Sequence, residues 1–197
     1  FAIISFAAFS QEKNIHPCDY GKRNNNAQAK SNQLSIADIA RTEKYDVKFY
    51  DLDIAMSNLN TDVNGTAGFH ATALESIDTI IFELFSTHTV TDVRLGGISV
   101  PYTHLNNMIK VPTSLVANDD FQVYVDYGGT PPNSSSNPFG GGGMSNDSSP
   151  TWGNQVTWSL SESFAAYEWF PVKQSLTDKA DSVDVSITVA DNLMAGS

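Results

Sequence analysis

One stretch decides the fold: Tyr45-Asp46-Val47-Lys48-Phe49-Tyr50-Asp51-Leu52-Asp53-Ile54. Apolar and polar side chains alternate along it, and a period of two is the pattern of a β-strand with one buried face. The alternation predicts that Val47 and Phe49 point inward. After a slip in the pattern, Leu52 and Ile54 continue the inward face. We therefore expect a half-buried strand over residues 45–54.

Short β-branched or aromatic segments of the same kind follow along the chain. Strands are expected at 66–74, 77–85, 90–95, 98–102, 108–111, 121–127, 155–160 and 182–189. Residues 60–65 end in Asn64-Gly65, a pair that favours the positive φ angles of a tight hairpin turn. Strands separated by turns about every eight to twelve residues predict an all-β fold. We expect a saddle-like β-sandwich or a curved, multi-stranded and mostly antiparallel sheet.

The chain divides into three parts by composition. Residues 1–10 are almost wholly apolar and end in Ala8-Phe9-Ser10; we interpret them as a signal-peptide remnant, with a hydrophobic N-terminal strand as the alternative. A signal peptide predicts a secreted or periplasmic protein. Residues 11–43 predict an irregular N-terminal arm, with one or two helical turns at 35–41. Residues 44–197 are expected to form one β domain. A Gly-, Ser- and Pro-rich loop at 128–153 interrupts this domain. We expect the natural protein to continue beyond residue 197.

Composition argues against two classes of partner. The formal net charge is −11, and phosphate binding needs a basic stripe that this sequence lacks, so no nucleic acid is expected. The apolar run at 1–10 is too short to span a bilayer, so no membrane partner is expected. Cys18 is the only cysteine. A single thiol makes neither an internal disulfide nor a structural zinc site.

No catalytic motif is complete in the sequence. The histidines are His16, His70, His88 and His104. They are widely spaced and none lies in H-E-x-x-H; His70 follows Phe69 in an expected strand and is predicted on the solvent face. There is no G-x-S-x-G elbow and no phosphate-binding G-K-[ST] sequence. Asp178, Asp181 and Asp184 leave a glycosidase-type carboxylate pair open, although a charged turn before a strand is the simpler interpretation.

Residues 158–171 concentrate aromatic side chains around one early carboxylate. The stretch reads Trp158-Ser159-Leu160-Ser161-Glu162-Ser163-Phe164-Ala165-Ala166-Tyr167-Glu168-Trp169-Phe170-Pro171. The plain interpretation is a core strand followed by a turn, with the aromatic rings buried and Glu162 exposed. We adopt it for the aromatic rings.

For Glu162 a family resemblance adds a role. The stretch resembles the end of the N-terminal domain in the aminopeptidase N-like zinc metallopeptidases, the gluzincin family that includes leukotriene hydrolase. There the segment reads roughly T-Q-x-E-P-x-x-A-R-x-W-F-P-C, followed by D-K-A and a strand. Aligned on Trp169-Phe170-Pro171, the family's Glu falls on Glu162 and its Ala on Ala166, and Asp178-Lys179-Ala180 continues the match. Over residues 45–197 the chain most resembles secreted members from Bacteroidetes-like bacteria.

The resemblance implies both an architecture and a role. In that family the N-terminal domain is a saddle-shaped β structure beside a thermolysin-like catalytic domain. It lends the active site one carboxylate, which holds the free α-amino group of the substrate, and by the match this is Glu162. An ammonium taken out of water needs a paired charge. The resemblance thus implies the non-catalytic N-terminal domain of a secreted zinc aminopeptidase, whose partners are its own catalytic domain and a peptide N-terminus. Zinc is expected in that catalytic domain, and no catalytic residue, metal or cofactor is expected in this chain.

Several positions depart from the family pattern. Leu160 replaces a Gln that helps shape the same subsite, Ser163 replaces Pro, and Val172 replaces Cys. Tyr167 stands where Arg is common. Residues 142–146 superficially resemble the family's G-x-M-E-N motif. They precede the Glu162 segment and lack the Glu, so we interpret that match as chance.

A second hypothesis belongs to a different functional class. A free-standing β-sandwich binding module for carbohydrate or protein would share the architecture without the chemistry. Trp152, Trp158 or Trp169 exposed on one face would support it, because sugars stack on aromatic planes. An H-E-x-x-H sequence downstream in the gene would favour the enzyme.

Overall fold

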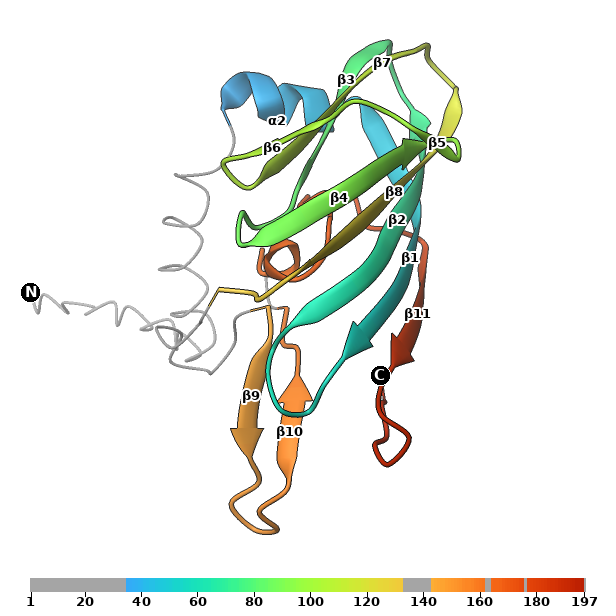
Figure 1. Ribbon diagram of the computed structural model, residues 1–197. Coiled ribbons are helices and arrows are strands. Elements are labelled where there is room, and N and C mark those ends of the chain that lie inside the picture. The colour runs from blue at the N-terminus through green and yellow to red at the C-terminus, as the bar shows by residue number, and fades with distance from the viewer. Residues whose placement is uncertain (1–34, 133–142, 162–163, 176, 197) are drawn as a thin grey trace, which may run out of the picture.

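The computed structural model describes residues 35–132, 143–161, 164–175 and 177–196. Its strands form three sheets, and the short helix α2 (Ile36–Thr42) precedes them (Figure 1). The signal-peptide remnant and most of the N-terminal arm lie outside the described residues, as do His16, Cys18 and Glu162. Helix α2 confirms the helical turns expected near the end of the arm. Its first turn is capped by Ser35, whose Oγ accepts a hydrogen bond from the Asp38 N–H at 3.1 Å.

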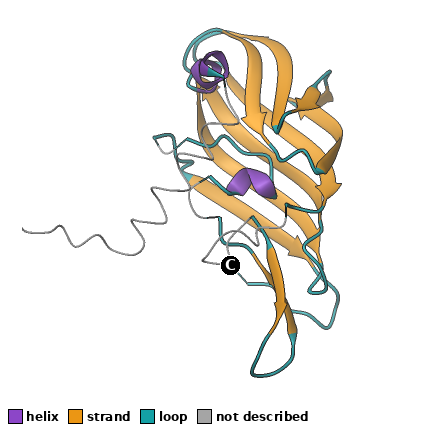
Figure 2. Ribbon diagram, turned by 90° about the vertical axis from the view of Figure 1, so that its left-hand side faces the viewer, coloured by secondary structure: helices purple, strands orange, loops and turns teal. Residues whose placement is uncertain are grey.

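The largest sheet has six strands in the order β11-β1-β2-β8-β4-β5. Their bounds are β1 (Tyr45–Met56), β2 (Val63–Ala73), β4 (His88–Leu95), β5 (Ile98–Ser99), β8 (Asp120–Gly129) and β11 (Ser182–Thr188). Neighbours are antiparallel except β1 and β11, which pair in parallel. The sheet is curved, and its strands bend along their length in Figure 2. The expected all-β, mostly antiparallel fold is confirmed.

A smaller sheet covers part of one face of the large one. It contains β3 (Ile77–Glu83), β7 (Met108–Leu115) and β6 (Thr103–Leu105), in the order β3-β7-β6. Helix α2 packs on β3 and is tied to β7 by an ion pair of 2.8 Å between Lys110 Nζ and Asp38 Oδ1. A separate hairpin of β9 (Ser145–Ser148) and β10 (Gln155–Trp158) projects below the sandwich in Figure 1.

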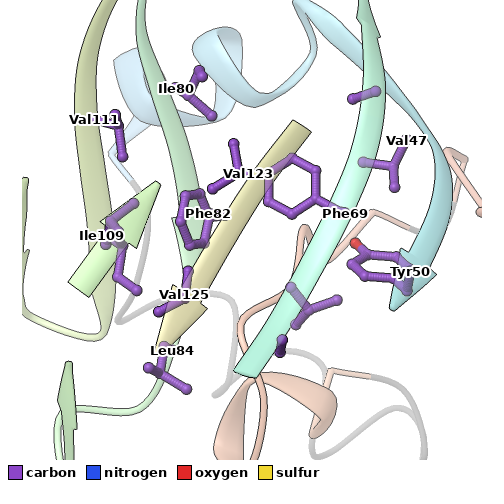
Figure 3. Close-up of a cluster of buried hydrophobic side chains, with 14 of the residues drawn as sticks. Val47, Tyr50, Phe69, Ile80, Phe82, Leu84, Ile109, Val111, Val123 and Val125 are labelled. Carbon is purple, nitrogen blue, oxygen red and sulfur yellow. The ribbon is translucent and has the colours of Figure 1, made fainter. Parts of the chain in front are cut away.

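The core lies between the two sheets, with Phe69 of β2 near its centre. Phe69 is 1 % exposed and its ring contacts four other aromatic rings, those of Tyr45, Tyr50, Phe82 and Phe121. Figure 3 shows Phe69 of the large sheet facing Phe82 of the small one across Val123. Burial of such apolar surface is the main favourable contribution to folding.

The slip predicted in β1 is a β-bulge, but it lies two residues earlier than expected. Val47 pairs with Ala71 and Phe49 with His70, so Lys48 is the extra residue between them. As a result Tyr50 is buried in the core, and Phe49 lies on the opposite face with its ring 5.1 Å from that of His70. The prediction that Phe49 points inward was therefore wrong.

Two predicted loops contain strand. Asn64 and Gly65 are not a hairpin turn: they pair with Ala55 and Ile54 inside the β1–β2 ladder. Gly65 has φ 155°, and a Cβ there would collide with the Asp53 carbonyl, so the glycine permits a close approach of two strands. The predicted loop at 128–153 likewise contains β9, while its residues 133–142 lie outside the described part.

Candidate functional site

The candidate site is the chain on either side of Glu162, residues 158–161 and 164–171. Glu162 and Ser163 lie outside the described residues, so the predicted site carboxylate itself has no described position. Before it, the chain continues from β10 to Ser161. After it, Phe164 has a positive φ of 79° and leads into the short 3-10 helix η1 (Ala166–Glu168), the small helix near the middle of Figure 2. The flanking residues therefore define how this segment is held.

Backbone hydrogen bonds attach η1 to the sandwich. The N–H of Phe85, which follows β3, donates to the carbonyl of Tyr167 at 2.8 Å. The hydroxyl of Tyr127, in β8, donates to the carbonyl of Trp169 at 2.9 Å. Tyr127 is 4 % exposed and Tyr167 is 6 % exposed, so each of these hydrogen bonds involves a buried residue of the core. This segment is thus fixed to strand β8 of the large sheet and to the chain that follows β3 of the small one.

His88 and Glu168 form a further buried contact beside η1. Nε2 of His88 lies 2.8 Å from the Glu168 carbonyl, and because a carbonyl only accepts, Nε2 carries the hydrogen. Burial lowers the pKa of His88, which keeps the ring neutral, and its buried Nδ1 has no partner among the described residues. The Glu168 carboxylate accepts a hydrogen bond of 2.6 Å from the Gly143 N–H, and burial raises its pKa. Glu168 thereby ties η1 to the chain that leads into β9.

The indole of Trp169 closes the segment on itself. Its Nε1–H donates to the Ser161 Oγ at 2.7 Å, and its ring lies against that of Phe170 with centroids 4.6 Å apart. A Cβ at Gly143 would lie 2.9 Å from Cδ1 of Trp169, so only glycine fits there without a shift. Ser161, Gly143 and Trp169 are thus packed together. Nothing in the sequence pattern signals this hydrogen bond, because it depends on the path of the chain between its partners.

The expected burial of the aromatic residues is only partly right. Tyr167 is buried, and Phe164, Trp169 and Phe170 are half-buried. Trp158, in contrast, is 41 % exposed. The physical reason is that β10 pairs with β9 alone and is not a strand of the sandwich. Val156 and Leu160 are also exposed, and Trp152 at the hairpin tip is 79 % exposed.

Past Pro171 the chain carries a buried cation. The side chain of Lys173 is 3 % exposed and forms an ion pair with Asp178. Its Nζ also donates to the Tyr45 carbonyl at 2.5 Å and lies 4.6 Å from the centre of the Tyr45 ring. Asp178 is therefore the partner of a buried lysine, and it lies in the irregular stretch that leads into β11, where a charged turn before a strand was predicted. Asp184 lies within β11, which begins at Ser182.

Glu83 is a second buried charge that the sequence analysis missed. It is 3 % exposed, and its backbone N–H and carbonyl pair with Val172 at 2.9 Å each. Its carboxylate accepts a hydrogen bond of 3.2 Å from Gln174 Nε2, and the backbone of Gln174 also bonds to it. Burial raises the pKa of Glu83 to about 7. The signal was present in the sequence, because Glu83 interrupts the apolar run Ile80-Ile81-Phe82-Glu83-Leu84.

The described histidines make structural hydrogen bonds. Nε2 of His70 lies 3.0 Å from the Tyr124 hydroxyl on the outer face of the sheet, as predicted, and Nε2 of His104 lies 2.9 Å from the Leu84 carbonyl. Within the residues that the structure describes, no three His, Cys, Asp or Glu side chains are grouped to hold a metal ion. A search of the same residues finds no helix with the length and apolar character needed to cross a membrane.

Comparison with solved structures identifies the architecture. A mutant of a two-domain M1 zinc metallopeptidase bound to L-arginine matches with a TM-score of 0.65 and 22 % identity, over 75 % of this chain and 33 % of that one. The M1 zinc metallopeptidase from Deinococcus radiodurans matches with a TM-score of 0.62 and 22 % identity, over 75 % and 33 % of the two chains. Yeast leukotriene A4 hydrolase in complex with bestatin gives 0.59 and 18 %, over 75 % and 23 %. This chain has the fold of the N-terminal domain of M1 zinc metallopeptidases.

The likeness is one of fold and covers part of those proteins. The chain spans about a third of the length of the metallopeptidases it matches. No protein-family profile matches the sequence, and no curated protein matches it either.

Proposed function

We propose that this chain is the non-catalytic N-terminal domain of a secreted zinc aminopeptidase and that it helps to bind the free N-terminus of peptide substrates. The observation that carries the proposal is the likeness to the N-terminal domain of M1 zinc metallopeptidases across three quarters of the chain. The sequence resemblance around Glu162 agrees with it independently. Zinc, in this proposal, is held by a catalytic domain that contributes the hydrolytic chemistry when joined to this one.

Exposed apolar side chains on this domain support the proposal that a second domain packs against it. Val183 and Val185 of β11 lie beside the buried Tyr50 and Leu52 of β1, yet they are 53 % and 40 % exposed in the part of the chain that the structure describes. Trp158 is exposed in the same way on the hairpin. Apolar surface of this kind is typical of an interface. The proposed occupant is the enzyme's own catalytic domain.

Within the proposed enzyme Glu162 binds the α-ammonium group of the substrate. A carboxylate in a partly water-excluded site forms a charge-assisted hydrogen bond with an ammonium and fixes its position. Internal peptide bonds offer no ammonium, so such an anchor selects the first residue of a peptide. The hydrogen bonds around η1 hold the chain on both sides of this residue, which is the structural requirement for a positioning charge.

The test compares wild type with Glu162→Ala and Glu162→Gln in the complete protein encoded by the gene. The assay measures kcat/KM for an aminoacyl reporter and for the same reporter with an acetylated amine. We expect a loss of about 100-fold or more with the free amine, little change with the blocked amine, and unchanged zinc content. The exposed Glu75→Gln, whose side chain is 70 % exposed, is the matched control and should keep wild-type activity.

Two outcomes would contradict the proposal. If the complete protein held no zinc and had no peptidase activity, the proposal that it is an aminopeptidase would be wrong. Wild-type amine selectivity in Glu162→Ala would remove the role of Glu162, and would leave this domain as a scaffold for the catalytic domain.

A free-standing binding module is the second candidate, and the tryptophans of the hairpin favour it. Trp152 and Trp158 are both exposed on one small projecting element. Exposed aromatic planes suit carbohydrate or protein ligands. Titration of the chain with neutral oligosaccharides, followed by tryptophan fluorescence, tests this function. Saturable quenching that disappears in Trp158→Ala supports it, and no change at millimolar sugar contradicts it.

Export is part of the proposal and has a separate test. The apolar residues 1–10, followed by a polar stretch from Gln11, support a signal peptide. N-terminal sequencing of the natural protein should find a mature chain beginning at or near Gln11. A natural protein that retains residues 1–10 would argue for the N-terminal strand instead.

A further inference from the structure

The bulge in β1 changes the outer face of the large sheet, the face that points away from the small sheet. Lys48 is the extra residue of the bulge, and Phe49 after it also lies on the outer face. Lys48 lines the same surface as His70 and Thr72 of β2. Bulges often redirect a side chain beside a functional site. Here the bulge brings a cation to the polar side chains of the neighbouring strand.

These side chains border an open hollow of about 610 Å³ on three strands that run side by side in Figure 1, β1, β2 and β8. We call it the outer hollow. Gly96 borders it where β4 has ended at Leu95, and a Cβ on Gly96 would meet no atom within 4 Å. The volume lies within the range of about 300 to 1,000 Å³ that is common for small-molecule sites. The side chains that line the outer hollow and form hydrogen bonds are those of Lys48, His70, Thr72, Asp120 and Gln122.

Part of this lining is held in place by contacts within the sheet. Nε2 of His70 lies 3.0 Å from the Tyr124 hydroxyl. The His70 ring also stands at a steep angle to those of Phe49 and Tyr124, with centroids 5.1 and 6.1 Å apart. The Thr72 hydroxyl donates to Asp120 Oδ1 at 2.6 Å. A ligand that binds here therefore meets side chains that are already ordered, which lowers the entropic cost of binding.

The lining keeps hydrogen-bonding capacity for a ligand. Among the described residues, Nδ1 of His70, Oδ2 of Asp120 and the side-chain amide of Gln122 have no hydrogen-bond partner. The side chain of Lys48 is 48 % exposed and forms an ion pair with Asp46. The outer hollow thus offers both donors and acceptors, and the charge of its lysine is compensated.

This combination fits a neutral ligand that is rich in hydroxyl groups. An anion would lie against the Asp120 carboxylate, and a cation against the Lys48 ammonium, so each would meet a like charge. A hydroxyl group both donates and accepts. It therefore pairs with an ammonium, with a carboxylate, with the amide of Gln122 and with either tautomer of His70.

We propose that the outer hollow is a binding site for a neutral oligosaccharide. Its hydroxyl groups exchange hydrogen bonds with the side chains of Lys48, His70, Asp120 and Gln122. The inference goes beyond the proposed function and does not rest on it. The alternative is a polar sheet face that is only hydrated, which is common in antiparallel sheets and predicts no saturable binding.

The test uses isothermal titration of the 197-residue chain with four neutral sugars: maltohexaose, cellohexaose, xylohexaose and N-acetylchitohexaose. We expect saturable binding of at least one of them. In a ¹⁵N–¹H spectrum that sugar should move the side-chain amide signals of Gln122, which Gln122→Ala identifies. Gln122→Ala and Lys48→Ala should each weaken binding about five- to tenfold. Both residues are exposed, so the urea midpoints should not change, and Lys179→Ala is the matched control on an exposed lysine that should bind as wild type does.

Four results would overturn the inference. The first is the absence of saturable binding for all four sugars at millimolar concentration. The second is wild-type affinity in both Gln122→Ala and Lys48→Ala. The third is loss of binding in Trp158→Ala with both of those variants unaffected, which would assign the sugar to the hairpin. The fourth is tighter binding of an anionic oligogalacturonate than of any neutral sugar, which would show recognition of charge. None of these results bears on the proposed aminopeptidase, because no peptidase activity is measured.

Discussion

Glu83→Gln should stabilise the chain at pH 8 and leave its stability unchanged near pH 4.5. The reason is the position of the carboxyl group: it is 3 % exposed, and its one hydrogen bond to a side chain comes from the neutral Gln174. Burial without a paired cation disfavours the charged form and raises its pKa to about 7 from an ordinary value of 4.5. Glutamine has nearly the same shape and cannot ionise.

The magnitude follows from the pKa of Glu83 in the folded and unfolded states. At pH 4.5 the Glu83 carboxyl is protonated in the folded chain, whereas it is ionised in about half of the unfolded chains. Its burial therefore lowers the free energy of unfolding by less than about 0.5 kcal/mol. As the pH rises to 7, the Glu83 carboxyl ionises in the unfolded state but stays largely protonated in the folded state, so the free energy of unfolding falls. Above pH 7 both states are ionised and the full cost of about 3 kcal/mol applies, from about 1.4 kcal/mol per pKa unit.

Urea denaturation followed by circular dichroism, at several values between pH 4.5 and 8.5, measures the difference directly. The gain of Glu83→Gln over wild type should grow from near zero to about 3 kcal/mol across this range, with its midpoint between the two pKa values. Glu75→Gln is the matched control on an exposed carboxyl and should stay within about 0.5 kcal/mol of wild type at every pH. A difference between Glu83→Gln and wild type that is the same at both ends of the range would refute the reasoning.

Two further predictions concern the core and its buried ion pair. Phe69→Ala removes the ring at the centre of the aromatic cluster and should lower the free energy of unfolding by about 3 to 5 kcal/mol in urea denaturation; a loss below about 1 kcal/mol would show that the core repacks. Lys173→Met leaves Asp178 without its cation and should cost about 3 kcal/mol or more. Adding Asp178→Asn should restore part of that loss, whereas strictly additive losses would show that the two side chains act independently.

The fold class was predictable because it depends on local periodicity. Strands such as β1 and β8 bury one face and show it as alternation along the sequence. The bulge at Lys48 was visible as a slip in that alternation, but the pattern did not fix which residue was extra. Pairing with β2 decided it, and placed Phe49 on the outer face.

The conformational preferences of single residues predicted the structure less reliably than the alternation of apolar and polar residues did. Asn64-Gly65 has the composition of a turn, yet it lies inside β2 because Gly65 is needed where two backbones approach closely. Trp158 looks like a core residue by its chemistry. It is exposed because β10 pairs only with β9, outside the sandwich. In both cases strand pairing across the sheet overrode the local preference.

The sequence by itself determined an all-β domain, its approximate strands and the segment around Glu162 that resembles a peptidase subsite. Only the tertiary structure decided the partners within that segment, namely the indole of Trp169 on Ser161 and the hydroxyl of Tyr127 on Trp169. It also decided the buried state of Glu83 in β3. Periodicity along a chain reports which face of a strand is buried. It carries no information about which distant groups meet, because those contacts are set by the packing of whole sheets.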